Sequence, residues 1–253
     1  MTRILLAARA GSRFIAALVA VVLVGAPSAR ANQEWGDQIP NLPTAGGCDG
    51  LCHATGLLTS PLYIDLEAAG FVWNATMANA DSDGDGFSNG WELQDPSGTW
   101  VSGTTDPGNA AFVSNPAFAN LLPPLPVATN PTAITHAEAA GQNGSEGFAL
   151  QNVGGVPFDY SITSSDIWMA PDPPSALGLP ASDQDAILVL FATNGLVDGL
   201  YQGDLTISIP GIRADRIPTI PVSLTVPEPG AVAAATGALL GLGMLGRRRV
   251  MRR

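Results

Sequence analysis

A twelve-residue segment, residues 81–92, restricts the local fold of this chain more than any other. Its sequence is Asp-Ser-Asp-Gly-Asp-Gly-Phe-Ser-Asn-Gly-Trp-Glu. Acidic side chains alternate along its first half, glycine stands at the sixth position, and glutamate stands at the twelfth. Glycine permits the sharp turn that lets such a segment wrap around a centre. The spacing therefore predicts a closed loop with its carboxylates turned inward.

This loop matches the pattern D-x-[DN]-x-[DN]-G-x5-E of a calcium loop at every defined position. The alternative is a solvated acidic turn that binds nothing. Ser88 is a departure, because paired calcium loops usually carry a β-branched apolar residue there, so we expect an isolated structural site rather than a sensor. An exported loop meets millimolar calcium, so weak affinity is sufficient. The expected ligands are side-chain oxygens and one backbone carbonyl, from Asp81, Asp83, Asp85, Phe87 (carbonyl), Asn89 (directly or through water) and Glu92 (bidentate).

The first 31 residues have the order of a secretory signal peptide. Three arginines precede an apolar run over residues 14–25, and Ala29 and Ala31 place small residues where signal peptidase acts. We expect cleavage before Asn32. A retained membrane anchor is the alternative, although the apolar run is short for a membrane span.

The charge of the chain excludes whole classes of partner. The chain has 22 acidic and 11 basic residues and no lysine, and residues 32–226 hold 21 acidic residues against two arginines, which gives −19. Nucleic acids and anionic lipids require clustered Lys or Arg, so binding to either is excluded for this span. A surface of this charge attracts divalent cations.

The C-terminal residues 227–253 form a three-part pattern. Pro227-Glu228-Pro229 precedes an uncharged apolar stretch, residues 230–246, and five arginines follow. The pattern resembles the PEP-CTERM sorting signal, which implies a transmembrane segment in the inner membrane, cleavage by an exosortase and transfer to the cell surface. Basic residues after the span favour a cytoplasmic end and an external preceding chain. A permanent, unprocessed anchor is the alternative.

Cys48, Cys52 and His53 allow three interpretations. A disulfide suits an oxidising compartment, since residues four apart on one helical turn lie within bonding distance. Covalent haem c attachment uses the order Cys-Cys-His, but three residues separate these cysteines instead of two. A redox pair or a metal site is the third possibility.

Residues 40–116 resemble the temptin-like cysteine domain of secreted proteins. The resemblance implies a binding or structural module, residues 32–116, without a catalytic role. Many relatives carry further cysteines that this chain lacks, so their disulfide pattern is not transferred. We expect Trp73, Trp91 and Trp100 to form a small core and a short helix over residues 74–80 to be capped by Asn74. The matching residues are Cys48, Cys52, His53, Ala69 to Trp73, the loop 81–92 with Leu93, Asp95, Pro96, Trp100 and Gly103.

A proline-rich linker, residues 117–130, precedes a span with regular period-two alternation of apolar residues. Glycine-containing turns separate the alternating segments, which predicts a β-sandwich of roughly seven strands over residues 131–226. The continuous apolar run 186–191 predicts a strand buried on both faces. The overall fold class is therefore mainly β, with a small calcium-loop domain followed by an immunoglobulin-like sandwich.

The sandwich resembles the BACON-type immunoglobulin-like domain, on residues 152–155, Trp168, residues 199–207 and residues 220–226. The resemblance implies carbohydrate binding, to which Trp168 and Tyr201 would contribute stacking faces. A spacer in which both rings only fill the core is the favoured alternative, because a fold alone does not specify a function.

These features together predict a non-enzymatic exported protein of the cell surface or exopolysaccharide matrix. The chain has two histidines and no His-Glu-x-x-His motif, and nothing singles out a pair of catalytic carboxylates. Expected partners are signal peptidase, an exosortase and possible exopolysaccharide. A haem c electron carrier and a carbohydrate-binding module are the alternative functions.

Overall fold

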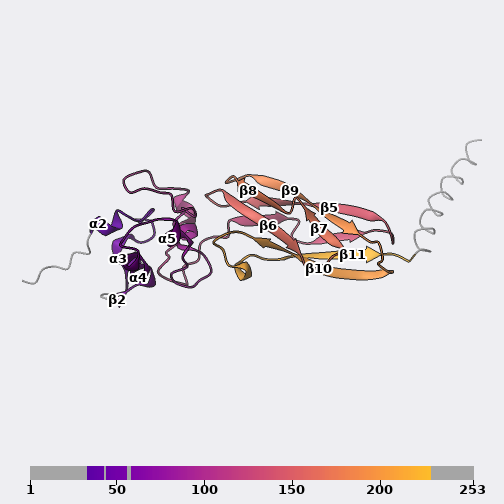
Figure 1. Ribbon diagram of the computed structural model, residues 1–253, viewed down its shortest axis with the longest axis horizontal. Coiled ribbons are helices and arrows are strands. Elements are labelled where there is room, and N and C mark those ends of the chain that lie inside the picture. Colours follow the sequence, from indigo (N-terminus) through magenta and orange to yellow (C-terminus); the bar gives the residue numbers. More distant parts are fainter. Residues whose placement is uncertain (1–32, 43, 56–57, 229–253) are drawn as a thin grey trace, which may run out of the picture.

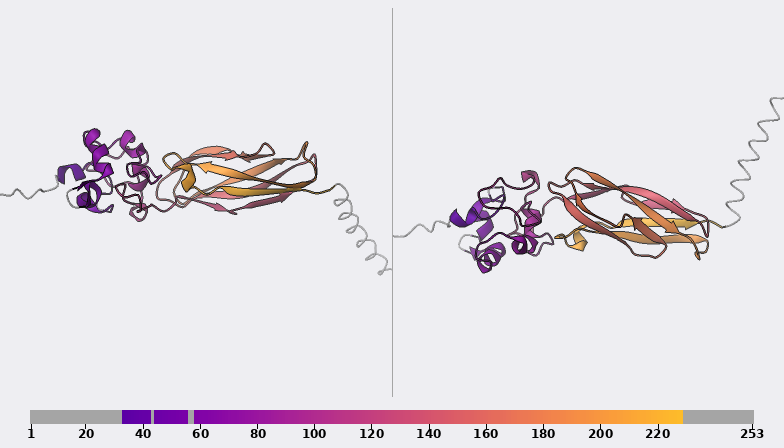
Figure 2. Two further views of the ribbon diagram at one scale, coloured as in Figure 1. Left: turned by 90° about the horizontal axis from the view of Figure 1, so that it is seen from below. Right: turned by 45° about the horizontal axis from the view of Figure 1, so that its top comes forward.

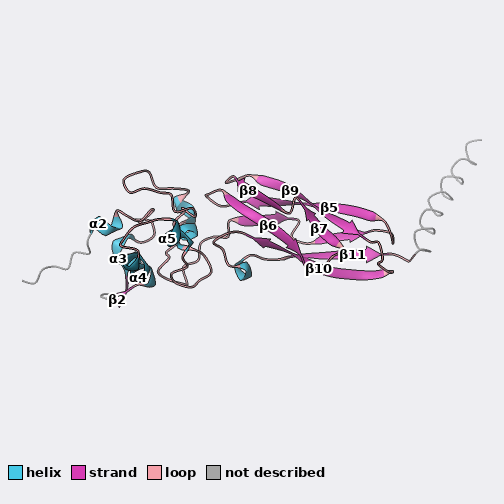
Figure 3. Cartoon of the chain, in the orientation of Figure 1, coloured by secondary structure: helices cyan, strands magenta, loops and turns pink. Residues whose placement is uncertain are grey.

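The computed structural model describes residues 33–42, 44–55 and 58–228. They form two domains placed end to end along the long axis of the molecule (Figure 1). The first domain, residues 33–118, consists of short helices and loops, and the second, residues 127–226, is a β-sandwich (Figure 3). The predicted signal peptide and residues 229–253 of the predicted tail lie outside the described residues. Within the described ranges, no helix is both long and apolar enough to cross a membrane.

The first domain has little strand. The helices Pro61–Ala68 and Ala75–Asn79 begin at residues with capping side chains, since Ser60 Oγ accepts from the Tyr63 N–H (3.0 Å) and Asn74 Oδ1 accepts from the N–H groups of Thr76 and Met77 (2.9 and 3.1 Å). The predicted helix with its Asn74 cap is therefore confirmed. The elements are α2 (Gln33–Gly36), α3 (Gly47–Cys52), β1 (His53–Thr55), β2 (Leu58–Thr59), α4 (Pro61–Ala68), α5 (Ala75–Asn79), α6 (Asn89–Glu92) and the 3-10 helix η1 (Ala110–Phe112).

A buried carboxylate organises the core of the first domain. Asp95 Oδ2 accepts hydrogen bonds from Trp73 Nε1 (2.7 Å) and from the Trp100 N–H (2.9 Å). Trp73 is buried and Trp100 packs against the same apolar cluster, so these two tryptophans form the predicted core. Trp91 is also buried, but it belongs to the core cluster of the sandwich.

The sandwich has nine strands rather than the seven expected. One sheet has the order β4-β11-β10-β6-β8 and the other β3-β5-β9-β7, and the pairing is antiparallel except between β11 and β4. The strands are β3 (Val127–Asn130), β4 (Ile134–Ala137), β5 (Asn143–Asn152), β6 (Phe158–Ser164), β7 (Met169–Asp172), β8 (Ser175–Leu179), β9 (Gln184–Ala192), β10 (Gly199–Ser208) and β11 (Ile220–Val226), with the 3-10 helix η2 (Ala214–Arg216) between the last two.

Two predictions about this domain need correction. β3 lies inside the segment assigned to the linker, so the sandwich begins at Val127, just after the last linker proline. β9 is not buried on both faces, because Leu188 and Leu190 are 46% and 42% exposed. Leu188 and Leu190 alternate with the buried Ile187, Val189 and Phe191 and point away from the core. This continuous apolar run therefore forms a strand with only one buried face.

The other predicted alternations are confirmed. The two sheets pack face to face (Figure 2). Their apolar residues form a single buried cluster. These residues are Phe148 and Leu150 of β5, Phe158, Tyr160 and Ile162 of β6, Leu205 and Ile207 of β10 with Ile209 beyond it, and Ile220, Val222, Leu224 and Val226 of β11.

Candidate metal centre

The predicted loop lies between α5 and α6 and is closed by its own carboxylates. Asp81 accepts from the N–H groups of Gly84 (2.9 Å) and Gly86 (3.0 Å), and Asp83 accepts from the N–H of Asp85 (3.1 Å). Gly84 and Gly86 have φ angles of 78° and 99°, a backbone region that other residues adopt at a cost. The wrapped conformation therefore depends on these glycines and on the alternating aspartates, as predicted.

The three aspartates converge. One carboxylate oxygen from each of Asp81, Asp83 and Asp85 lies within 4.8 Å of the others. Among the described residues, Oδ2 of Asp83, Oδ2 of Asp85 and Oε2 of Glu92 are buried without a hydrogen-bond partner. Buried carboxylate oxygens are normally satisfied, so these three need a ligand that accepts their lone pairs.

Glu92 is the most deeply buried acid of the loop, with 0% of its surface exposed. Its Oε1 accepts from Ser114 Oγ (2.8 Å). Desolvation, opposed by the Ser114 hydrogen bond and increased by the nearby aspartates, raises the pKa of Glu92 to about 9. Desolvation also raises the pKa of Asp83 to about 6 and shifts that of Asp85 upward. A cation bound in the loop would stabilise the ionised carboxylates and so offset the cost of burying them.

The other two predicted ligands make further contacts, and their roles as ligands stay predictions. Asn89 is fully buried, and its side chain is bonded to Ser82 and to the Met77 carbonyl (2.9 Å), so it holds the loop to α5 rather than facing the aspartates. Phe87 has its ring in the apolar core of the sandwich, and its N–H donates to Asp85 Oδ1 (2.7 Å). The atoms that converge are therefore carboxylate oxygens, which suit a hard divalent cation such as calcium.

The sandwich contributes neighbours to the loop that the loop motif does not predict. The backbone of Arg213 donates to the Gly86 carbonyl (2.7 Å), and its guanidinium donates to the Gly84 carbonyl (3.2 Å). Arg216 lies beside the loop. The charges of Arg216 and Arg213 partly offset the rise that desolvation causes in the pKa of Asp85. These are the two arginines of residues 32–226. Their isolation in an acidic span was the signal that could have found them.

The cysteine segment forms α3 and the start of β1. Cys52 is buried in the core of the first domain, and His53 is half-buried with an unpaired Nδ1 among the described residues. Cys48 lies one helical turn before Cys52 in α3, but its side chain lies outside the described part. The arrangement is compatible with the disulfide interpretation and leaves the three alternatives as predictions.

Trp168 lies inside the sandwich, and Tyr201 is half-buried against its core. Trp168 is 6% exposed and packs against Phe191 at 6.2 Å between ring centroids. Tyr201 packs on Trp168 at 6.3 Å, and its hydroxyl bonds to the backbone of Val197. Neither ring forms an open platform, which agrees with the role of core aromatics.

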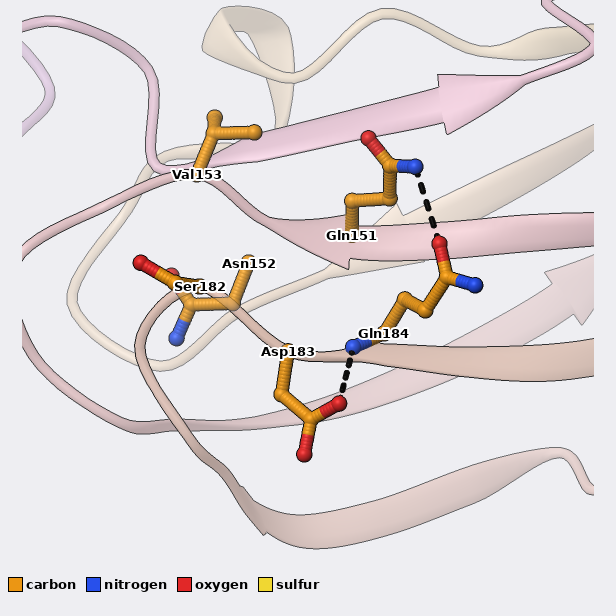
Figure 4. A pocket seen from close by; sticks show the side chains of 6 residues that line it. All are labelled: Gln151, Asn152, Val153, Ser182, Asp183 and Gln184. Atoms are coloured by element: carbon orange, nitrogen blue, oxygen red, sulfur yellow. Dashed lines mark hydrogen bonds between the residues drawn. The ribbon is translucent and has the colours of Figure 1, made fainter.

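A separate cavity of about 410 Å³ lies at one end of the four-stranded sheet (Figure 4). Its polar side chains bond mainly to one another, as Gln151 Nε2 donates to Gln184 Oε1 (2.9 Å) and Asp183 Oδ1 accepts from the Gln184 N–H (2.8 Å). The Asn152 side-chain amide donates hydrogen bonds to the carbonyls of Val156 and Leu179. The cavity is a surface hollow whose polar groups serve the fold.

Part of the predicted sorting motif is described. Pro227 and Glu228 continue in an extended backbone beyond β11, and Glu228 is exposed, whereas Pro229 lies outside the described residues. β11 runs away from the first domain, so the chain leaves the sandwich at the end opposite that domain (Figure 1).

Solved structures with low similarity match the sandwich. A PapD-like domain of human CEP192 has a TM-score of 0.34 and 13% identity, covering 41% of this chain and 86% of that one. A protein of unknown function from Porphyromonas gingivalis W83 has a TM-score of 0.37 and 14% identity, covering 42% and 49%. Scores this low carry no argument about function.

The first domain has a clear relative. Residues 29–118 match the family model described as Temptin C-terminal. Temptin of Aplysia californica is 36% identical over 110 residues, which are 42% of this chain and 87% of Temptin. Through this domain, the chain belongs to the temptin family.

Proposed function

We propose that this protein is an exported, non-enzymatic structural or adhesive protein whose first domain is stabilised by calcium. The observation that carries the proposal is the convergence of Asp81, Asp83 and Asp85 within 4.8 Å, with unpaired buried oxygens on Asp83, Asp85 and Glu92. Calcium takes carboxylate oxygens in flexible geometry, and an exported site needs only weak affinity.

The two-domain arrangement supports a display role. The sandwich separates the first domain from the end at which the chain continues into the proposed tail (Figure 1). A PEP-CTERM tail processed by an exosortase would then hold the sandwich near the envelope and present the temptin-like domain outward. The sandwich, proposed as BACON-type, acts as a spacer because Trp168 is packed in its core and Tyr201 is half-buried against that core.

Calcium binding is tested by isothermal titration of exported, metal-free protein. We expect one site with a dissociation constant of about 0.1–1 mM, the range of extracellular modules. Asp83→Asn removes a converging carboxylate and should abolish measurable binding. Asp183→Asn makes the same change at an exposed site and should leave binding unchanged. Absence of binding to the unaltered protein would refute the proposal.

The proposed matrix role rests on the charge of −19 over residues 32–226. Calcium would bridge this acidic surface to anionic exopolysaccharide, because two negatively charged surfaces repel each other unless a cation lies between them. Chelation should then release the protein from biofilm material, and addition of calcium should restore retention. Retention that chelation does not change would exclude calcium bridging.

The denatured intact mass of the exported protein separates the disulfide from the haem interpretation. A disulfide between Cys48 and Cys52 lowers the polypeptide mass by two hydrogens, which we expect because an oxidising compartment favours it. A mass increased by a covalently bound haem would instead make the protein an electron carrier and refute the structural role.

A further inference from the structure

The acidic loop is also the contact between the two domains. Phe87 pairs with Ile212 of the β10–β11 connection in an antiparallel bridge. The Ser88 N–H donates to the Gly211 carbonyl (2.8 Å), and the Arg213 N–H donates to the Gly86 carbonyl (2.7 Å). The sandwich segment thus pairs with the loop near Ser88, the position at which a second loop would pair in a two-loop calcium domain.

Apolar packing reinforces this contact. Phe87 and Trp91 are 3% and 4% exposed and belong to the core cluster of the sandwich, although both come from the first domain. Trp91 Nε1 donates to the Pro210 carbonyl (2.7 Å), and its ring lies 6.2 Å from that of Phe158. The segment 84–91 therefore contributes to both the acidic cluster and the sandwich core.

The charges at the contact also need a cation. When all four loop carboxylates are ionised, as calcium binding requires, they and Asp215 bring −5, and Arg213 and Arg216 bring +2, which leaves −3. Arg213 is already engaged by Asp215 (2.6 Å). A divalent cation would reduce the net charge to −1, so the wrapped loop that pairs with Ile212 is more favourable with the ion than without it.

We propose that calcium in the loop locks the two domains together, through the pairing of residues 86–88 with residues 211–213. This inference rests on the proposed calcium binding. The ion and the sandwich segment both require the same wrapped backbone at Gly84 to Ser88, so each stabilises the conformation that the other binds. Coupling of this kind is reciprocal, and loosening the domain contact must weaken calcium binding by the same factor.

Hydrogen exchange measured by mass spectrometry on the full exported protein tests this coupling. In the unaltered protein, calcium should slow exchange at least about fivefold in peptides covering residues 81–92 and residues 210–217. Peptides from β5, away from the contact, should not change. The amides of Ser88 and Arg213 donate across the contact, so these peptides report its opening directly.

Gly211→Val is the variant that separates the two domains without removing a carboxylate. A Cβ at Gly211 would lie 2.7–2.9 Å from Trp91 and Ser88, and its φ is 80°. Gly195→Val is the matched control, because Gly195 also has a positive φ of 86° but nothing within 4 Å of the added Cβ. We expect Gly211→Val to lose calcium-dependent protection in residues 210–217 and to weaken calcium binding at least about fivefold. Gly195→Val should behave as the unaltered protein.

The outcomes distinguish this inference from the proposed function. Calcium binding with protection confined to residues 81–92 in the unaltered protein would overturn the coupling and leave calcium binding intact. Undiminished calcium affinity in Gly211→Val would overturn it as well. Absence of any calcium binding would refute the proposed function and the coupling with it. The measurements on the unaltered protein retain their value if Gly211→Val does not fold.

Discussion

Replacement of Glu92 by glutamine should stabilise the protein without calcium and should lose this advantage when calcium is present. The side chain is fully buried, its Oε1 accepts from Ser114, and its Oε2 has no partner among the described residues. Glutamine preserves the size of the side chain and an acceptor for Ser114. It removes the charge that burial disfavours, and it removes the carboxylate that would close the calcium site.

The size of the effect follows from the raised pKa. The folded-state pKa of Glu92 is about 9, above the ordinary value of 4.5, so this group contributes stability below pH 4.5 that is lost as the pH rises toward 9. Each pH unit is worth about 1.4 kcal/mol, so the metal-free protein loses on the order of 3 kcal/mol by pH 7. Glutamine avoids this loss, and Tm should rise by about 6–12 °C at about 2–4 °C per kcal/mol.

Calcium should cancel the advantage of the variant. At a concentration about 100-fold above the dissociation constant, calcium stabilises the unaltered protein by about 2.7 kcal/mol. Glu92→Gln lacks the bidentate ligand and should gain little, so the difference in Tm between the two proteins should close. The assay is thermal unfolding at pH 7 in chelator and in excess calcium.

The exposed Glu67 on α4 provides the control, since Glu67→Gln makes the same chemical change on the surface. It should leave Tm and the calcium shift unchanged. A lower Tm for Glu92→Gln in chelator would refute the buried-charge argument. A calcium shift equal to that of the unaltered protein would show that Glu92 does not bind the ion.

Three further predictions concern the fold and its pH dependence. In chelator, Tm should fall as the pH rises from about 4.5 to 9 because Glu92 is buried, and Asp83 should add to the fall up to about pH 6. Excess calcium should remove this fall. Identical Tm-against-pH profiles in chelator and in calcium would contradict the prediction. Asp95→Ala should cost about 2–4 kcal/mol in urea unfolding, since it leaves Trp73 Nε1 without its acceptor, and a loss below about 1 kcal/mol would contradict the role of this carboxylate. Asn152→Ala should cost a similar amount, since two buried carbonyls and one N–H lose their partner; a change in Tm below about 2 °C would argue against it.

Local chemistry made parts of this structure predictable. The wrapped loop follows from the glycine at 86 and the alternating aspartates, and the cap of α5 follows from Asn74. The period-two pattern of Ile220 to Val226 identifies β11 and its buried face. In each case, the residues that determine the structure lie within a few positions of one another, so the sequence contains the whole interaction.

Long-range contacts account for most of what was not predicted. Trp91 is next to Glu92 in sequence, yet it packs in the sandwich, where the Pro210 carbonyl, 119 residues away, accepts its indole N–H. Leu188 and Leu190 differ from their buried neighbours only in the face of β9 on which they lie. Asn89 fits the ligand pattern, but the end of α5 approaches closely enough to take its amide.

The contact between the domains explains how a single acidic loop of this kind can be stable. A single loop leaves the backbone near Ser88 without a strand partner and exposes the apolar residues beside it. In this protein, Gly211 accepts from the Ser88 N–H, and the sandwich core encloses Phe87. The departure at Ser88 from the paired-loop pattern then has a structural reason. The Ser88 side chain lies against the backbone of Gly211. A larger side chain at either position would not fit in the space between them.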